Sequence, residues 1–287
     1  MTPAEYCQQK VGAPGSSFYY SVLYLPVDKR EALTAIYAYC CEIEEILDKC
    51  QEPDVARAKL AWWRQETQNI LSHKPNHPIG RALQTVIAAH RLPEGRFAAL
   101  IDGVEMSLSE GRFDTFEALR SHCERVGATA SVLAAHVLGY GDPVTLDSAR
   151  ELGVALTLTK VIRDLRAHAS RNRIYIPLED LRRYDVPIAH ILNGTETSEL
   201  RALVEFECGR AEQCYDRALA LIPEKDRWSQ LSGLIMAAIY RRTLDEIRRD
   251  GYHVMRHRTH LPPLRKLWIA WTTRRKERRR SRRRIRF

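Results

Sequence analysis

The side chains best suited to chemistry fall in two short stretches of the chain. In the first, three carboxylates occupy five positions, namely Glu44, Glu45 and Asp48. Residues 44 and 48 are four apart, so on a helix they share a face, with Glu45 beside them. Oxygen ligands on a helix face suit Mg²⁺ bound to a substrate phosphate. A solvated acidic helix face ending at Lys49 fits the same residues, and spacing alone does not separate the two.

In the second stretch, polar residues recur at spacings of three, four and four, and two arginines follow. The set is Thr157, Lys160, Asp164, His168, Arg171 and Arg173. On a helix the first four form one stripe. A carboxylate followed by a turn that carries arginines can bind a phosphate group. A salt-bridged surface stripe explains these residues equally well.

Helical periodicity dominates the rest of the chain and must position these residues. Helices are predicted over residues 29–50, 55–72, 80–90, 95–109, 115–139, 145–168, 196–222 and 226–250. Asp28 and Glu31 suggest a capping box before the first of these helices. Only residues 173–177 look extended, because they are β-branched and precede a proline. We therefore predict an all-α fold, with one domain over residues 1–260 and a tail over 261–287.

Composition excludes several classes of protein. The chain has 287 residues, 45% of them hydrophobic, which is enough to bury a core without disulfides or a structural metal. Its seven cysteines show no Cys-x-x-Cys spacing, which favours buried thiols in a reducing compartment. No signal sequence is evident, and no apolar run approaches the ~18 residues that span a bilayer. A cytoplasmic protein is the expectation.

The positive charge lies in the tail. Residues 264–287 hold twelve Lys or Arg and one Glu, a net +11, so the formal +9 of the chain leaves about −2 for residues 1–263. Leu264, Leu267, Trp268 and Trp271 form an apolar stripe at helical spacing. Such a helix suits the surface of an anionic membrane, here the inner face of the cytoplasmic membrane. A helix docked on the bundle is the alternative, and nucleic-acid binding is not favoured, because the body is slightly acidic.

Several separated motifs carry a family resemblance. They are Tyr6–Lys10, Gly15–Ser21 with Leu25-Pro26, Ala35–Cys40, Ala58–Arg64, Ile101–Met106, Arg173–Pro177, Gly233–Tyr240 and Leu264–Trp271. Over nearly its full length the chain resembles the squalene/phytoene synthase family, in particular the bacterial presqualene diphosphate synthase type. The resemblance implies an isoprenoid (terpenoid) synthase helical bundle around a central cavity. It also implies head-to-head joining of two prenyl diphosphates, such as farnesyl diphosphate, with Mg²⁺ held between two Asp-rich helices.

The resemblance also assigns roles to residues. As metal ligands it implies Glu44, Glu45, Asp48 and Asp164, and as catalytic residues Asp48, Asp164 and Tyr175. As substrate-binding residues it implies Lys160, Arg163, Arg171 and Arg173, with Phe18 and Tyr19 lining the tunnel. It does not indicate whether a reductant such as NADPH takes part.

The chain departs from the family pattern at about half of these positions. Glu44 and Glu45 replace Asp, and Cys41 replaces the Arg before them. In the second motif Thr157, Lys160 and His168 replace Gln, Asn and Asp, and Ser107 replaces an Asp elsewhere. A unit cation about 5 Å from a divalent ion costs on the order of 5 kcal/mol at an effective dielectric constant of about 20. Lys160 therefore disfavours a full three-ion cluster, and His168 is a poor Mg²⁺ ligand.

Three hypotheses about activity follow. The first is that the protein keeps the isoprenoid cavity but has impaired or lost head-to-head condensation, and acts as a membrane-associated binder or scaffold. The second is an active presqualene diphosphate or squalene synthase with an adapted Mg²⁺ site, because Glu also binds Mg²⁺. The third is a different prenyl chemistry. In any of them, Lys160 and the neighbouring arginines could bind a diphosphate directly.

Overall fold

The structure is a computed structural model that describes residues 1–50 and 52–284. The helices of this part are α1 (Pro3–Val11), α2 (Ser17–Val22), α3 (Val27–Lys49), α4 (Pro53–Leu71), α5 (Pro78–His90), α6 (Gly95–Glu110), α7 (Phe116–Leu138), α8 (Val144–Arg163), α9 (Leu165–Ala169), α10 (Leu178–Arg183), α11 (Ile188–Leu192), α12 (Ser198–Leu221), α13 (Leu231–Arg249) and α14 (Pro263–Arg284). The extended segment contributes one isolated parallel bridge, between Arg112 and Ile174. The predicted all-α fold is confirmed.

The prolines predict where helices begin better than the capping box does. Pro53 and Pro78 each occupy the first position of a helix, where the missing N–H has no intrahelical partner to lose. The capping box predicted at Asp28 is wrong, because α3 begins at Val27 after Pro26 and has no side-chain cap. The predicted helix over 145–168 is also interrupted, since α8 ends at Arg163 and α9 starts at Leu165. The break falls at Asp164, within the predicted polar stripe.

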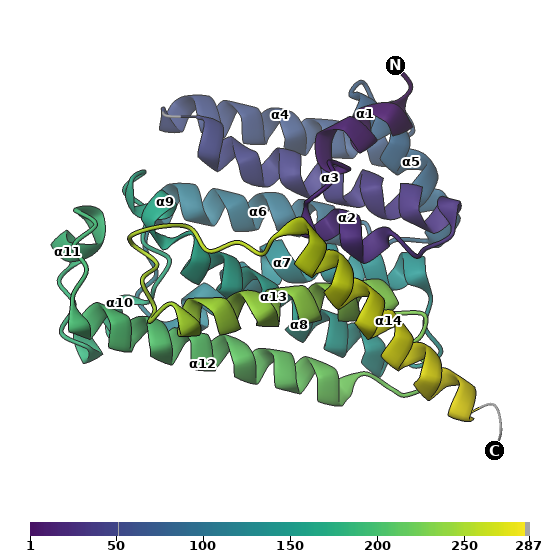
Figure 1. Ribbon diagram of the computed structural model, residues 1–287. Helices are drawn as coiled ribbons and strands as arrows, with labels where there is room; N and C mark the ends of the chain where they lie inside the picture. Colours follow the sequence, from purple (N-terminus) through teal and green to yellow (C-terminus); the bar gives the residue numbers. More distant parts are fainter. Residues whose placement is uncertain (51, 285–287) are drawn as a thin grey trace.

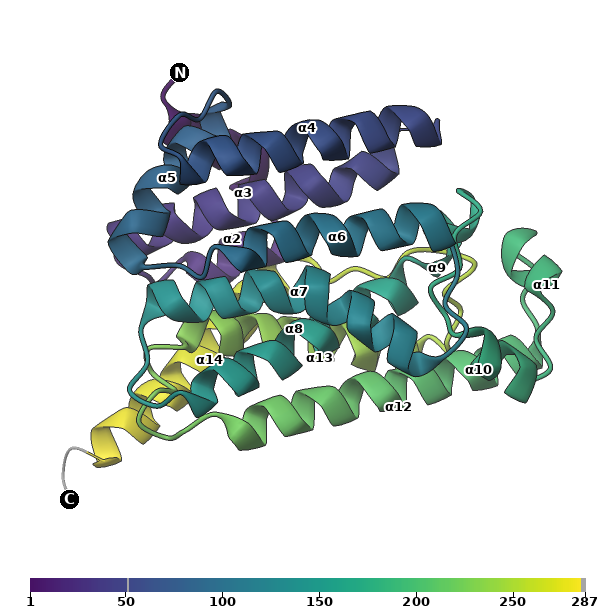
Figure 2. The same ribbon diagram turned by 180° about the vertical axis from the view of Figure 1, so that it is seen from behind.

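Two large hydrophobic cores hold the bundle together, and Figures 1 and 2 show the arrangement of the helices that build them. One is built from α1 to α7 and centres on α3, whereas the other is built mainly from α8, α12 and α13. Helix α7 contributes to both cores and packs along α8 and α6. The two carboxylate-bearing helices, α3 and α8, thus belong to different halves of the molecule. The space between the halves is where a ligand could be held.

Helices α7 and α8 approach each other closely through glycines. A Cβ on Gly153 would lie 2.4 Å from the Ala128 Cα, and a Cβ on Gly127 would lie 1.9 Å from the Thr157 Oγ1. Any larger residue would push the helices apart. Thr157 also donates a hydrogen bond to the Gly153 carbonyl. The Thr that replaces the family's Gln is therefore part of the helix packing.

Helix α14 lies obliquely across α2 and α13 and extends beyond the bundle (Figure 1). It packs through Ile269 and Ala270, and a buried ion pair joins Glu277 to Arg227. The apolar stripe predicted at Leu264, Leu267, Trp268 and Trp271 lies on the opposite face, with exposed fractions of 81%, 39%, 60% and 45%. The helix is thus docked on the bundle and still presents its tryptophans outward. No helix in the described part of the chain is long and apolar enough to cross a membrane.

Candidate functional site

A cavity lies between the two cores. Side chains from α2, α3, α7, α8, α12 and α13 line it, and its wall is mainly apolar. Lining residues on α8 run from Thr145 to Lys160, about 22 Å along the helix axis. At the Thr145 end, the polar groups are bonded within the fold: Thr145 donates to Asp226 and Ser148 to the Ala218 carbonyl. This long apolar cavity suits an extended hydrocarbon chain.

The other end of the cavity is polar and charged. Lys160 Nζ lies 2.8 Å from a carboxylate oxygen of Glu44, and both side chains line the cavity with Tyr37 and Tyr240. The Lys160 and Glu44 side chains are each about one-third exposed. Burial alone would lower the pKa of Lys160, but attraction to Glu44 outweighs it and holds that pKa well above its usual value. Lys160 is therefore an ammonium at the head of an apolar cavity.

The other two carboxylates of the motif on α3, Glu45 and Asp48, also pair with cations. Glu45 accepts hydrogen bonds from Lys10 at 2.8 Å and from Lys49, and these bonds lower its pKa against the effect of burial. Asp48 lies 3.3 Å from an Arg171 guanidinium nitrogen. Glu44 and Asp48 share a helix face as predicted, but each carboxylate of the motif has its own basic partner.

Asp164, at the break between α8 and α9, is held by two arginines. Arg163 donates to both of its oxygens, at 2.9 and 2.5 Å, and Arg258 does so at 2.5 and 3.3 Å. Burial alone would raise the pKa of Asp164, but the bonds from Arg163 and Arg258 outweigh it and hold that pKa well below its usual range. The negative charge of Asp164 is thus balanced by these two arginines of the protein itself.

The predicted arginines of the following loop reach back to α3. Arg171 pairs with Asp48, and Arg173 Nη1 donates to the Leu47 carbonyl at 2.6 Å. The structure therefore brings the loop and the end of the first carboxylate helix together. This contact joins the two sequence stretches, as the predicted phosphate site requires.

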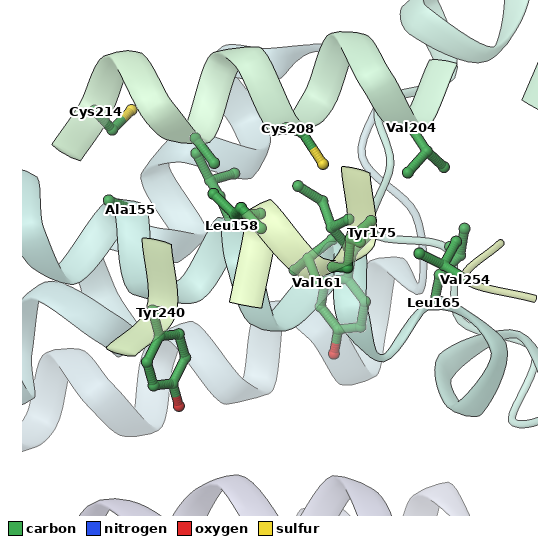
Figure 3. Close-up of a cluster of buried hydrophobic side chains, with 14 of the residues drawn as sticks. Ala155, Leu158, Val161, Leu165, Tyr175, Val204, Cys208, Cys214, Tyr240 and Val254 are labelled. Atoms are coloured by element: carbon green, nitrogen blue, oxygen red, sulfur yellow. The ribbon is translucent and has the colours of Figure 1, made fainter. Parts of the chain in front are cut away.

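Tyr175 packs in a ring cluster behind this site. Its ring lies 4.7 Å from that of His168, 5.5 Å from that of His122 and 5.8 Å from that of Phe113. Figure 3 shows the hydroxyls of Tyr175 and Tyr240 pointing out of the hydrophobic cluster on the same side. Burial lowers the pKa of His168 and of His122 to about 4, so both imidazoles are neutral at neutral pH. His168 therefore adds no charge to the site.

The two predicted tunnel residues on α2 lie differently. Phe18 lines the cavity and stacks on Tyr37, with ring centroids 4.2 Å apart. Tyr19 does not line this cavity. It borders a separate surface groove between α1, α3 and α5, with its ring edge against Tyr20. Successive residues of an α-helix point roughly 100° apart around its axis, so Phe18 and Tyr19 face different sides of α2.

Cysteines behave as small apolar residues throughout the fold. All seven are free thiols, and only Cys41 is more than slightly exposed. Cys41 occupies the position of the family's arginine, and burial raises its pKa to about 12. The predicted role as buried thiols agrees with this burial, and no cation is present at position 41 to support a diphosphate.

The site residues do not fit a cluster of metal ions. Among the described residues, no three His, Cys, Asp or Glu side chains come close enough together to hold one. Glu44 is paired with Lys160, Asp48 with Arg171, and Asp164 with two guanidinium groups. Mg²⁺ would need free carboxylate oxygens in near-octahedral geometry. In this arrangement, each of these carboxylates is bonded to at least one basic side chain.

The sequence patterns missed three residues around this end of the cavity. Tyr240 lines the cavity, and the Arg163 Cζ lies 5.9 Å from its ring centroid. Arg258 pairs with Asp164, and Lys266 donates to the Gly15 carbonyl at 2.8 Å. Lys266 could have been found, because it precedes Ile269 and Ala270 by three and four residues and so belongs to the buried face of α14. Arg258 lies in an irregular segment that gives no such signal.

Comparison with known proteins gives the family. The model of the squalene/phytoene synthase family matches residues 11–265. The chain belongs to the squalene/phytoene synthase family. A phytoene synthase of Arthrospira platensis is 30% identical over 279 residues, covering 92% of this chain and 89% of that protein. A phytoene synthase of Mycobacterium tuberculosis is 32% identical over 257 residues, covering 88% of this chain and 84% of that protein.

Solved structures show the same fold. A dehydrosqualene synthase has a TM-score of 0.81 at 23% identity, covering 96% of each chain. A squalene synthase from Alicyclobacillus acidocaldarius has a TM-score of 0.76 at 23% identity, covering 87% of this chain and 94% of that one. The predicted isoprenoid synthase bundle is confirmed. Members of the squalene/phytoene synthase family bind prenyl diphosphates and generally use Mg²⁺ to do so.

Proposed function

We propose that this protein binds an isoprenoid diphosphate, such as farnesyl diphosphate, in the cavity between its two cores, and that its head-to-head condensation is impaired or lost. The observation that carries the proposal is the Lys160–Glu44 ion pair, 2.8 Å long, at the charged end of the apolar cavity. The apolar wall of the cavity matches the hydrocarbon chain of such a ligand, and its charged end matches the diphosphate.

Impaired condensation follows from how the leaving group would be stabilised. Breaking the bond between an allylic carbon and diphosphate requires the departing negative charge to be neutralised. Clustered divalent ions provide several charges at short range, whereas Lys160 provides one. Glu44, Asp48 and Asp164 are each committed to a basic partner. The residues retained from the family, namely Arg163, Asp164, Arg173 and Tyr175, support the alternative of an active presqualene diphosphate or squalene synthase.

A product assay separates these two functions. Purified protein is incubated with Mg²⁺ and either farnesyl or geranylgeranyl diphosphate, with and without NADPH, and the extracted lipids are analysed. A phytoene synthase relative run in parallel serves as positive control. We expect no C30 or C40 product above about one-thousandth of the control rate. Presqualene diphosphate, squalene or phytoene at the control's rate would establish the active alternative.

A variant restored toward the family pattern provides the reciprocal test. It combines Glu44→Asp, Glu45→Asp, Lys160→Asn and His168→Asp, so that the ion pair with Lys160 is removed and the four existing acids gain a fifth. We expect product formation to rise above that of the wild type in Mg²⁺. A folded variant, checked by circular dichroism, that forms no more product would show that these positions are not what limits the reaction.

We further propose peripheral association with an anionic membrane through α14. The exposed apolar residues Leu267, Trp268 and Trp271 lie on a helix rich in arginine, which gives both apolar insertion and charge complementarity. Co-sedimentation with vesicles of phosphatidylcholine, with and without 30 mol% phosphatidylglycerol, tests this. We expect binding to the anionic vesicles and loss of it in Trp268→Ser/Trp271→Ser. Equal binding of the variant would rule out this face.

A further inference from the structure

Four cations from three segments lie at or beside the charged end of the cavity. Lys160 and Arg163 come from α8, Arg258 from the connection after α13, and Lys266 from α14. The facing carboxylates are Glu44 and Asp164, which leaves a net charge of +2 on these six groups. Figure 1 shows the connection from α13 passing beside α9 and reaching α14 next to α2. The C-terminal segment thus supplies half of the cations.

Contacts through Tyr240 and Asp164 link Lys160, Arg163 and Arg258, and Lys266 lies close enough to the two arginines to be repelled by them. Arg163 and Arg258 share Asp164, and Arg163 also lies against the ring of Tyr240, which lines the cavity with Lys160. Lys266 reaches the Gly15 carbonyl at the start of α2, which carries Phe18 into the cavity wall. Burial, and then repulsion from Arg163 and Arg258, lowers the pKa of Lys266. An anion beside these groups would relieve that repulsion.

We propose that Lys160, Arg163, Arg258 and Lys266 bind the diphosphate of an isoprenoid directly, with no divalent ion, while its chain lies in the cavity. This inference rests on the proposed function. Among the described residues, the hydrogen bond of the Lys160 ammonium goes to Glu44, and an ammonium has two further donors for phosphate oxygens. Arg163 and Arg258 each donate to Asp164 through Nε and Nη2, and a guanidinium has five N–H donors in all, so further donors can serve a phosphate. A divalent ion at this position would be repelled by Lys160.

A binding experiment in the absence of turnover tests the inference. The probe is farnesyl thiodiphosphate, an analogue that ionises poorly, titrated calorimetrically into the full-length protein in 5 mM MgCl₂ or in 5 mM EDTA. We expect dissociation constants that agree within about threefold under the two conditions. Binding in MgCl₂ that is lost in EDTA would overturn the inference and leave the proposed isoprenoid binding intact. No binding in either buffer would overturn the proposed function itself.

Lys266 offers the sharpest variant, because its neighbour Arg265 is a matched control. Both lie on the first turns of α14, but Arg265 pairs with Glu246 at 2.7 Å and is not part of the cation group. We expect Lys266→Ala to weaken binding in EDTA by tenfold or more, the usual effect of losing a charge-assisted hydrogen bond. Arg265→Ala should stay within twofold of the wild type. Equal affinities of the two variants would remove Lys266 from the site.

Lys160→Asn should change the affinity for farnesyl thiodiphosphate in opposite directions in EDTA and in MgCl₂. Removing the ammonium should weaken binding in EDTA at least tenfold, and it should free Glu44 so that MgCl₂ now strengthens binding. If Lys160 had only a structural role, the variant would change the affinity equally in both buffers. Thermal unfolding of each variant in the absence of ligand confirms that the fold is retained.

Discussion

Two ion clusters inside the fold have similar charges but different surroundings. Arg210 on α12 binds Asp180 at 2.7 Å and Glu207 at 2.8 Å, and these two carboxylate side chains are only 4% and 2% exposed. Its guanidinium also packs on the rings of Phe116 and Phe206. The Lys160–Glu44 pair instead faces a cavity, and each side chain is about one-third exposed. The carboxylates of the first cluster are almost fully enclosed by protein, whereas the second cluster faces a cavity, where its bonds can be exchanged or extended.

From this difference we propose that the charge at position 160 serves binding more than stability. A buried pair whose partners are fully enclosed contributes through the large cost of removing one partner. A pair at a cavity surface can be hydrated when one partner is removed, so its loss costs less. Variants that break each cluster should therefore separate stability from ligand affinity.

Arg210→Met should have the largest effect on stability. It leaves Asp180 without its cation, and we expect the free energy of unfolding to fall by about 3–5 kcal/mol. Urea unfolding followed by circular dichroism measures this. Arg201→Met, an exposed position on the same helix, should change stability by less than about 0.5 kcal/mol. A loss below about 1 kcal/mol for Arg210→Met would mean that the enclosed cluster is not structural.

Lys160→Met should reverse this pattern. Because Glu44 faces the cavity, we expect a loss of unfolding free energy of no more than about 1–2 kcal/mol. Affinity for farnesyl thiodiphosphate in EDTA should nevertheless fall at least tenfold. Destabilisation as large as that of Arg210→Met, measured by the same urea titration, would contradict the distinction between the clusters.

The pH dependence of stability provides a further contrast. Burial raises the pKa of Glu207 to about 8 from the usual 4.5. The folded state thus holds a proton that the unfolded state releases above about pH 4.5, so stability falls as pH rises from about 5 to 8, by up to about 1.4 kcal/mol per pH unit. Glu207→Gln should flatten this slope. Urea titrations at pH 5, 6, 7 and 8 test it, and an unchanged slope would assign the pH dependence to other groups.

Periodicity and prolines were sufficient to predict most of the fold. The long helices appear within a few residues of their predicted bounds, because their apolar spacing reflects the core they bury. The shorter α1, α2, α10 and α11 were missed, since helices of five to nine residues show too few turns for a period to be recognised. The break at Asp164 was missed because the stripe continues through it.

The site was predicted in part. Spacing placed Glu44 and Asp48 on one face and Lys160 in the second motif, and the structure joins them. Spacing could not indicate that Lys160 pairs with Glu44 across the cavity, because such contacts depend on how two distant helices pack. Spacing likewise gave Arg258 no role, because a segment without regular secondary structure has no periodicity from which the direction of a side chain can be predicted. The apolar stripe of α14 was identified correctly, but only the packing shows that it points outward.

The smallest effect on stability is expected on that outward face. Trp268 is 60% exposed, whereas its neighbour Ile269 is 4% exposed and packs against the bundle. Trp268→Ala should change the free energy of unfolding by less than about 0.5 kcal/mol, and Ile269→Ala should lower it by about 2 kcal/mol or more. Urea unfolding of both variants in the absence of lipid measures the difference. A large loss for Trp268→Ala would mean that the tryptophan stabilises the bundle itself. Its exposure would then no longer support a membrane partner.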